Sequence, residues 1–271
     1  MAEAPPPSGY ALVTGASAGL GAAFARSLAA RGRPLLLVAR RRPPMEALLA
    51  EARQRYGVPG EALSLDLTAE DAAPRLRDFV AGRPVEILVN NAGLGLSAPF
   101  LEADPERLRR IVRLNCEAPV LVARALLPDM VRRGRGSMIV VSSIAAFQPT
   151  PWVAVYGASK AFDLMWAEAL AVELEGTGVR VLTLCPGHTR TEFHAVAGVD
   201  RPAAGARPAE PEEVVEETLR RLGRSRVLVP GAWNRWMMRL GALLPRRSRA
   251  RAAGRLLRRR LEAAEGPAAR S

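Results

Sequence analysis

"YALVTGASAGLG" (residues 10–21) decides the fold that this sequence predicts. The apolar run 10–14 is typical of a buried strand, and the alanine-rich segment after the glycines predicts a helix that ends at Gly32. Glycines at 15, 19 and 21 allow the backbone to approach a ligand closely, and the start of the helix offers free N–H groups. The stretch therefore predicts a pyrophosphate-binding strand–turn–helix unit, with a tight packing turn as the alternative. No Gly-Lys-Ser/Thr follows, so it is not a Walker A loop.

The same alternation continues along the chain. Apolar runs predict strands at 34–39, 62–67, 85–90, 137–143, 179–184 and 226–230. Helical patterns separate them at about 44–57, 69–82, 104–133, 153–176 and 211–223. Strands that are apolar throughout indicate a mostly parallel sheet with helices on both faces. We therefore expect a doubly wound α/β fold that binds its ligand outside the carboxyl ends of the strands.

Charge divides the chain into two parts. The net charge is +12, but residues 231–271 hold eleven arginines and two glutamates and so carry +9 of it. Because the rest of the chain is only weakly basic and has no nucleic-acid motif, we expect no nucleic-acid partner. We expect a disordered lead-in at 1–8, a dinucleotide-binding catalytic domain at 9–230 and a helical, basic, amphipathic tail at 231–271.

The tail leaves two interpretations open. Aromatic and apolar residues beside clustered arginines suit a helix at the surface of an anionic membrane. The alternative is a helix packed on its own domain or on another subunit of a homo-oligomer. No apolar run reaches the ~18 residues of a membrane span, and the first residues lack a signal-peptide pattern. We therefore expect a cytoplasmic protein, with peripheral contact at the inner membrane surface if the first interpretation holds.

Metal and disulfide chemistry are not indicated. Cys116 and Cys185 lie far apart without CxxC spacing, so we expect reduced thiols. His188 and His194 have no carboxylate or cysteine partner at ligand spacing, so we expect no metal site.

The end of the second strand bears on the choice of nucleotide. Ala39 occupies the position where an acidic side chain would bind a ribose 2′-hydroxyl and repel a 2′-phosphate. Arg40 and Arg41 follow, and guanidinium groups bind phosphate well. We therefore expect NADP(H) to be favoured over NAD(H), while a solvated basic loop is the alternative.

"YGASK" (residues 156–160) holds the only lysine of the chain. Tyr156 and Lys160 are four residues apart on an expected helix and so share a face. A phenol has a pKa of ~10, and a nearby ammonium lowers it toward the range useful for acid–base catalysis. Ser143 ends an expected strand, where its hydroxyl can polarise a carbonyl oxygen. The three together indicate a catalytic set.

With these motifs the chain resembles the short-chain dehydrogenase/reductase family. "TGASAGLG", "NNAG" (90–93), Asn115, "VSS" ending at Ser143, "YGASK" and "PGHTRT" (186–191) match the family pattern in order over about residues 9–230. The resemblance implies a Rossmann-type fold in which Tyr156 exchanges a proton with the substrate, Lys160 lowers its pKa and binds ribose, Ser143 polarises the carbonyl, and Asn115 holds a relay water. It also implies that Asp66 meets the adenine, that Asn90, Ala92 and Gly93 line the adenosine side, and that Pro186, Gly187 and Thr191 hold the nicotinamide. With the residues already discussed, the expected cofactor contacts are Gly15, Ser17, Gly19, Leu20, Gly21, Arg40, Arg41, Asp66, Leu67, Asn90, Ala92, Gly93, Tyr156, Lys160, Pro186, Gly187 and Thr191.

Two further expectations concern backbone. Pro119 has no N–H for the carbonyl of Asn115, so we expect a kink in the long helix, and the freed carbonyl is a candidate to hold the relay water. Residues 192–210, rich in alanine, glycine and proline, are expected to form a mobile lid.

The sequence thus predicts an NADPH-dependent oxidoreductase that interconverts an apolar ketone or aldehyde and an alcohol. A 3-oxoacyl thioester reductase, whose acidic carrier would suit the basic surface, is an alternative within enzymes. A dinucleotide-binding scaffold or redox sensor without turnover is the alternative from another class. The small-molecule substrate itself is not specified by these motifs.

Overall fold

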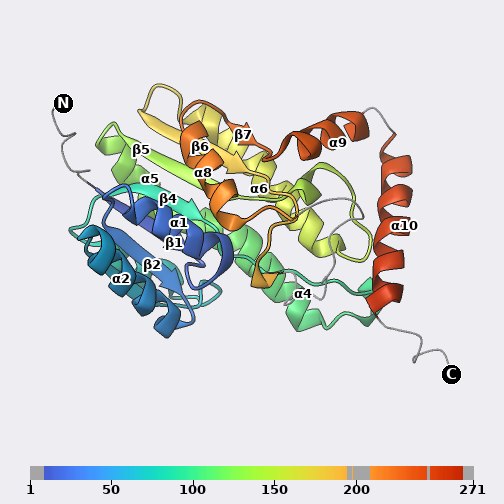
Figure 1. Cartoon of the computed structure of the whole chain (residues 1–271), viewed down its shortest axis with the longest axis horizontal. Coiled ribbons are helices and arrows are strands. Elements are labelled where there is room, and N and C mark those ends of the chain that lie inside the picture. Colours follow the sequence, from blue (N-terminus) through green and yellow to red (C-terminus); the bar gives the residue numbers. More distant parts are fainter. Residues whose placement is uncertain (1–8, 194–196, 198–207, 243–244, 265–271) are drawn as a thin grey trace.

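The computed structural model describes residues 9–193, 197, 208–242 and 245–264. The expected lead-in at 1–8 and most of the expected lid at 192–210 lie outside these residues. Within the described part, seven parallel strands form one sheet in the order β3-β2-β1-β4-β5-β6-β7 (Figure 1). The strand order reverses between β1 and β4, so the crevice at their carboxyl ends is the expected ligand site of a doubly wound fold.

The strands are short, and all except β3 are mainly apolar, as the sequence predicts. Their bounds are β1 Tyr10–Thr14, β2 Leu35–Ala39, β3 Gly60–Ser64, β4 Val85–Asn90, β5 Gly136–Val141, β6 Val179–Leu184 and β7 Val227–Leu228. All residues of β2 are buried, because helices cover both faces of the sheet.

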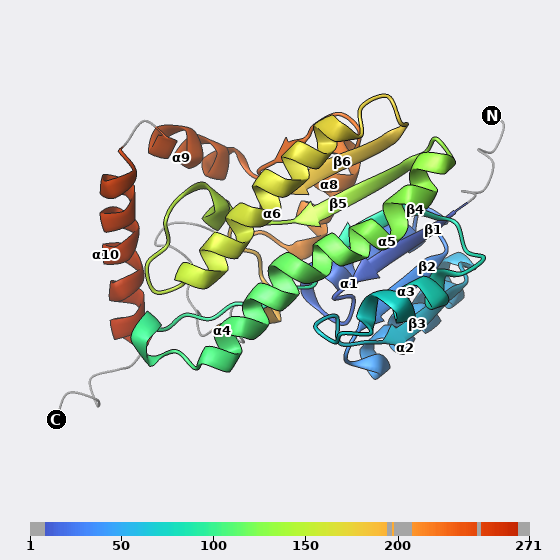
Figure 2. The ribbon, with the colours of Figure 1, turned by 180° about the vertical axis from the view of Figure 1, so that it is seen from behind.

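Two hydrophobic cores hold the helices onto the sheet. Helices α1 (Gly19–Ala29), α2 (Arg42–Tyr56) and α8 (Pro211–Arg221) cover one face, where Phe24 and Met45 are fully buried. Helices α3 (Ala72–Val80), α5 (Ala118–Arg132) and α6 (Ala154–Glu173) cover the other, where Leu76 and Met130 are fully buried (Figure 2). The expected doubly wound fold is therefore confirmed.

The third strand differs from the expectation. It was expected at 62–67 but spans Gly60–Ser64, because its extent follows its neighbour: Leu35 pairs with Gly60, and Ala39 pairs with Ser64. Leu65 and Leu67 lie beyond the strand and are nevertheless buried, which explains why the apolar pattern continues past its end.

The helix expected at 104–133 is divided. Helix α4 (Pro105–Val112) is followed by a π-helical turn, η2 (Arg113–Glu117), and then by α5. The N–H of Ala118 bonds the carbonyl of Arg113, five residues back. Pro119 begins the next turn without an N–H to donate, so an irregularity at this point follows from the sequence.

The tail contains two helices, α9 (Ala232–Ala242) and α10 (Arg246–Ala264). Figures 1 and 2 show both at the end of the molecule far from α2, where α10 stands next to the loops that precede α4 and α6. Short 3-10 turns in these loops span Phe100–Glu102 (η1) and Ile144–Phe147 (η3). In the part of the chain that the structure describes, no helix combines the length and the apolarity needed to cross a bilayer.

Candidate active site

A cleft of about 420 Å³ opens at the carboxyl ends of the strands. It is lined by the turn after β1 and by the loops after β2, β3, β4, β5 and β6, together with the first turns of α6. Most of the residues predicted from the sequence line it: Gly15, Ser17, Gly19, Leu20, Arg40, Arg41, Asp66, Leu67, Ala92, Gly93, Ser143, Tyr156, Lys160, Pro186, Gly187 and Thr191.

The glycine-rich turn has a shape that only glycine allows. Gly15 has a φ of 65°, in the left-handed region that favours glycine. A Cβ on Gly21 would lie 2.3 Å from the carbonyl oxygen of Gly15, so the start of α1 sits directly on the turn. Gly21 therefore packs behind the cleft and does not line it. The prediction of a tight strand–turn–helix unit is correct, and the N-terminus of α1 borders the open space.

Asn90, the last residue of β4, and Asn91, which follows it, both serve the scaffold. Asn90 is buried and donates to the carbonyl of Pro119 at 3.1 Å, so it does not line the cleft. Asn91 donates to the carbonyl oxygens of Thr14 and Gly15 at 2.9 and 3.3 Å. Asn91 therefore ties the loop after β4 to the glycine-rich turn and fixes one wall of the cleft against another.

Asp66 lines the cleft and forms an ion pair there. Its carboxylate accepts hydrogen bonds from Thr68 N–H and hydroxyl at 3.0 and 2.8 Å and contacts Arg110 at 2.6 Å. Burial works to raise the pKa of Asp66, but these hydrogen bonds and the charges of Arg110 and Arg40 outweigh it and hold the pKa below its usual value.

The arginines after β2 stand at the rim of the cleft. Arg41 reaches the hydroxyl of Ser17 at 3.4 Å and forms an exposed ion pair with Glu192 at 3.1 Å. Arg40 is exposed beside it. Both arginines thus line the cleft at the end of β2, and Arg41 also contacts the glycine-rich turn.

Tyr156 lines the cleft and contacts both Ser143 and Phe193. Its ring centroid is 5.4 Å from that of Phe193. Burial raises the pKa of Tyr156, and the charge of Lys160 and the hydrogen bond with Ser143 lower it by less. The lowering influence of lysine that the sequence predicts is present, but the net pKa lies above the ordinary value.

Lys160 is buried, with 5% of its surface exposed. Its ammonium donates to the carbonyl of Val141 at 2.8 Å and to Asp163 Oδ2 at 2.9 Å. Burial opposes the charged form, but Asp163 and Tyr156 outweigh it and raise the pKa of Lys160. The second oxygen of Asp163, Oδ1, is buried and has no hydrogen-bond partner among the described residues.

Asn115 lies within the π-helical turn and behind the cleft wall. Its side chain accepts a hydrogen bond from Leu94 N–H at 2.8 Å and donates to Leu94 O and Ser159 Oγ, both at 2.9 Å. The side chain thus anchors the loop after β4 to α6. Whether its backbone carbonyl holds a water stays a prediction.

The order of these motifs along the chain is that of a known protein family. A family model described as short chain dehydrogenase matches residues 9–201. The chain belongs to the short-chain dehydrogenase family. The resemblance stated on the motifs is confirmed, and this short-chain dehydrogenase keeps the family's Ser–Tyr–Lys residues together at one cleft.

Relatives of this short-chain dehydrogenase carry the names of different reductases and dehydrogenases. A very-long-chain 3-oxoacyl-CoA reductase from Phaeosphaeria nodorum is 37% identical over 222 residues, or 80% of this chain and 64% of the relative. The chain thus spans less than two thirds of that relative's length. A short-chain dehydrogenase from Sphingobium yanoikuyae in complex with NADPH is 34% identical, with a TM-score of 0.78 over 86% of this chain and 93% of that one. A 7beta-hydroxysteroid dehydrogenase is 27% identical, with a TM-score of 0.84 over 91% and 96%.

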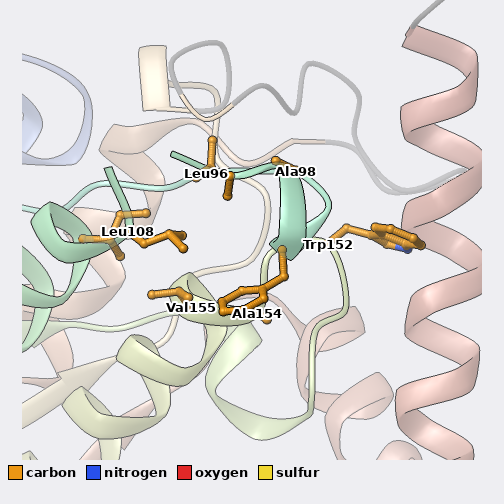
Figure 3. A pocket seen from close by; sticks show the side chains of 9 residues that line it. Leu96, Ala98, Leu108, Trp152, Ala154 and Val155 are labelled. Atoms are coloured by element: carbon orange, nitrogen blue, oxygen red, sulfur yellow. The ribbon is translucent and has the colours of Figure 1, made fainter. Parts of the chain in front are cut away.

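A second, smaller cavity lies beside the cleft. Its volume of about 30 Å³ suits a water molecule or two, so it is too small for a substrate. Leu96, Leu108 and Val155 line it (Figure 3). Trp152 borders it, but its ring is directed at α10, where Nε1 donates to Gly254 O at 3.2 Å (Figure 3). Trp152 therefore connects the loop before α6 to the tail.

Three neighbours of the cleft are absent from the sequence prediction. Arg110 pairs with Asp66, Asn91 bridges two loops, and Asp163 pairs with Lys160. Asn91 stands within the quoted "NNAG" motif, so its position was visible although its role was not. Asp163 lies three residues after Lys160, at helical spacing for a pair, but nothing in the sequence marks that pair as buried. Arg110 carries no sequence signal.

Proposed function

We propose that the protein is an NADPH-dependent reductase of an apolar ketone or aldehyde, working with Tyr156 as the general acid. The observation that carries the proposal is that Ser143, Tyr156 and the buried Lys160 meet in the cleft that the glycine-rich turn borders. The relatives named as a 3-oxoacyl-CoA reductase and a steroid dehydrogenase support an apolar carbonyl substrate.

The residues of the cleft fit a nicotinamide dinucleotide. Gly15 and Gly19 line the cleft at the N-terminus of α1, where free N–H groups favour a pyrophosphate. Asp66 would contact the adenine, and Arg40 and Arg41 would hold a ribose 2′-phosphate. Pro186, Gly187 and Thr191 line the opposite end, beside Tyr156. When bound, the reduced nicotinamide supplies the hydride that adds to the carbonyl carbon.

The chain's own groups supply the proton and the polarisation. Ser143 donates a hydrogen bond to the carbonyl oxygen and so stabilises the negative charge that develops there. Tyr156 then transfers its phenol proton to that oxygen, which completes the alcohol. A raised pKa keeps Tyr156 protonated at neutral pH, the form that reduction requires. Lys160 stabilises the phenolate that remains, and its third donor is available to the ribose.

A 3-oxoacyl thioester reductase is the second candidate. The 37% identity to a very-long-chain 3-oxoacyl-CoA reductase favours it, and the chemistry at Tyr156 would be the same. The two candidates differ only in the substrate that the cleft binds: a ketone or aldehyde in the first, a 3-oxoacyl thioester in the second.

The experiment is a substrate panel that follows NADPH absorbance with apolar ketones, aldehydes and 3-oxoacyl thioesters. We expect turnover of at least one class and its loss in Tyr156→Phe, which removes the transferable proton. NADPH binding without turnover of any class would instead favour a dinucleotide-binding scaffold or redox sensor.

Cellular place and partners belong to the same proposal. We expect a cytoplasmic protein, and the basic tail adds a membrane surface as partner. The exposed side chains of α9 and α10 support a membrane partner.

A further inference from the structure

Helix α9 presents its apolar side chains to solvent. Trp233, Trp236, Met237 and Leu240 are spaced by three, four and seven residues, so they share one face of the helix. Their exposed fractions are 60, 52, 45 and 46%. The two indole rings stack with centroids 5.2 Å apart. These four residues form an apolar stripe that no other described part of the chain covers.

The orientation of the apolar stripe is fixed by the other side of α9. Asn234 packs against Gly187, where a Cβ would lie 2.6 Å from its amide nitrogen, and it donates to Pro230 O at 2.9 Å. Asn234 and Met238 are half-buried and lie about a third of a turn away from the stripe. Helix α9 therefore contacts the domain through Asn234, and its tryptophans face away from the domain.

Helix α10 presents arginines in the same manner. Arg247, Arg251, Arg255 and Arg258 are exposed and fall on one side of the helix, forming an arginine stripe. Away from that stripe, Ala253 is buried against the domain. Between residues 218 and 261 the sequence holds fourteen arginines and neither aspartate nor glutamate. The tail thus combines the exposed arginine stripe of α10 with the exposed tryptophans of α9.

Both helices adjoin the walls of the reactive cleft. Asn234 of α9 contacts Gly187, which lines the cleft. On α10, Arg249 donates to Phe147 O at 3.2 Å, and Gly254 O accepts from Trp152. These contacts join the tail to the loop after β6 and to the loop between Ser143 and Tyr156. Whatever binds the tail therefore lies close to the substrate side of the cleft.

We propose that the apolar stripe of α9 and the arginine stripe of α10 dock the protein onto an anionic lipid surface. Tryptophan rings settle at the level of lipid headgroups, and arginines are attracted by anionic headgroups. A second copy of the chain is a poorer occupant, because a two-fold interface brings identical surfaces together and would oppose the two arginine stripes. An acidic carrier protein could form ion pairs with the arginines, but it would not explain the four exposed apolar side chains on one face of α9.

Docking in this way places the cleft next to the bilayer. Resting on the proposed function, this identifies the substrate class as an apolar carbonyl compound dissolved in the membrane. The tail would then bring the active site to a substrate that water holds at low concentration.

The test is co-sedimentation of the full-length protein with phosphatidylcholine vesicles, with and without phosphatidylglycerol. We expect binding to the anionic vesicles at low salt and its decline as salt screens the arginines. Trp233→Ala with Trp236→Ala should weaken binding about tenfold or more, as should Arg251→Gln with Arg255→Gln, since each arginine near an anionic surface contributes measurably. Arg53→Gln with Arg77→Gln, which removes two exposed arginines from α2 and α3, is the matched control and should bind normally.

The outcomes separate docking from catalysis. Turnover of a short, water-soluble ketone without vesicles should be unchanged in the stripe variants, so its absence in every protein would overturn only the proposed function. Absence of vesicle binding at low salt would overturn the docking proposal, as would equal binding by stripe and control variants. Tight binding of an acidic acyl carrier protein in place of vesicles would overturn it too.

Discussion

Lys160 is the only lysine in a chain with 38 arginines, and its surroundings explain why this position has an ammonium group. A buried ammonium has three donors on a narrow stem. Two of them are used by Val141 O and Asp163, and the third is left for the cleft that Lys160 lines. A planar guanidinium is wider and cannot point its donors in these three directions from the same place.

Lys160→Arg should therefore lose activity. We expect kcat/KM to fall ~100-fold or more, equivalent to ~2.7 kcal/mol of transition-state stabilisation. The larger side chain should also lower stability by ~1–3 kcal/mol, because the site is closely packed. Kinetics and a thermal melt measure both effects, and Arg53→Lys on the exposed surface of α2 is the control for the exchange itself. If Lys160→Arg kept near wild-type activity, catalysis would not require an ammonium group at this position.

Asp163 gives this site a second charge that bears on Tyr156. The titratable groups that act on Tyr156 are Lys160 and Asp163 on the same helix and Cys185 after β6. Cys116 on the π-helical turn interacts with Asp163 and Lys160. The pKa of the Cys185 thiol is raised to about 12, chiefly by burial, so that thiol stays neutral. Burial also raises the pKa of the Cys116 thiol. The negative charge of Asp163 thus acts on Tyr156 without a competing anion, and it raises the phenol pKa.

Asp163→Asn should shift the pH dependence of kcat/KM to lower pH. Oxidation needs the phenolate, so its rate rises as pH passes the Tyr156 pKa; reduction needs the phenol and falls there. Removing the carboxylate charge lowers that pKa, so both limbs move toward acid. The measurement is a pH profile in each direction, with Glu173→Gln, an exposed change on the same helix, as control. A loss of rate with an unmoved profile would assign Asp163 a packing role only.

At the scale of elements, the strands were predictable where burial alone defines them. The expected bounds 85–90 and 179–184 agree with β4 and β6. The third strand was misplaced because its end depends on where β2 stops pairing, which the apolar pattern does not contain. The irregularity before α5 was predictable from Pro119, but its π-helical form was not, because several local geometries relieve a missing N–H.

In the site, too, local features could be predicted from the sequence and tertiary contacts could not. Residues whose spacing reflects local backbone, such as Gly15 and the Tyr156–Lys160 pair, were predicted from the sequence. Asp163 was not predicted, because a charged helical residue reads as solvent-facing until its burial is known. Arg110 is exposed, and its ion pair with Asp66, 44 residues away in the chain, depends on a tertiary contact that no local pattern marks. Asn90 and Gly21 were predicted as cofactor contacts, yet the structure places them behind the cleft wall.

The loop between β2 and α2 should select the cofactor. Arg40→Ala with Arg41→Ala is expected to weaken NADPH binding about tenfold or more, because charge-assisted hydrogen bonds to a 2′-phosphate are lost. NADH binding should change little, since it lacks that phosphate. Arg42 is the matched control: it follows directly but pairs with Glu46 and does not line the cleft. Titration of both cofactors measures the effect, and equal losses for the two would refute the assignment.

At the scale of the whole molecule, the tail is attached to the loop between Ser143 and Tyr156. Trp152 has a φ of 69°, a strained value for a residue other than glycine. Its carbonyl accepts from Ala98 N–H at 2.8 Å and its indole donates to Gly254 O, so loop and tail hold it together. The two large cores contain no residue of α9 or α10. The sheet and its covering helices therefore depend little on the tail, whereas the loop before α6 depends on it directly.

A protein ending at residue 230 should consequently fold but work differently. We expect cooperative melting with Tm lowered by several degrees, because both cores are retained and only peripheral contacts are lost. Vesicle binding should disappear with the two stripes. Affinity for NADPH should be nearly unchanged, but KM for an apolar ketone should rise, because the loop around Trp152 loses the partner that holds its strained backbone. Melting, cofactor titration and steady-state kinetics on the full-length and shortened proteins test each part. Collapse of the shortened protein would show that the tail is an integral packing element and that the boundary at residue 231 is wrong.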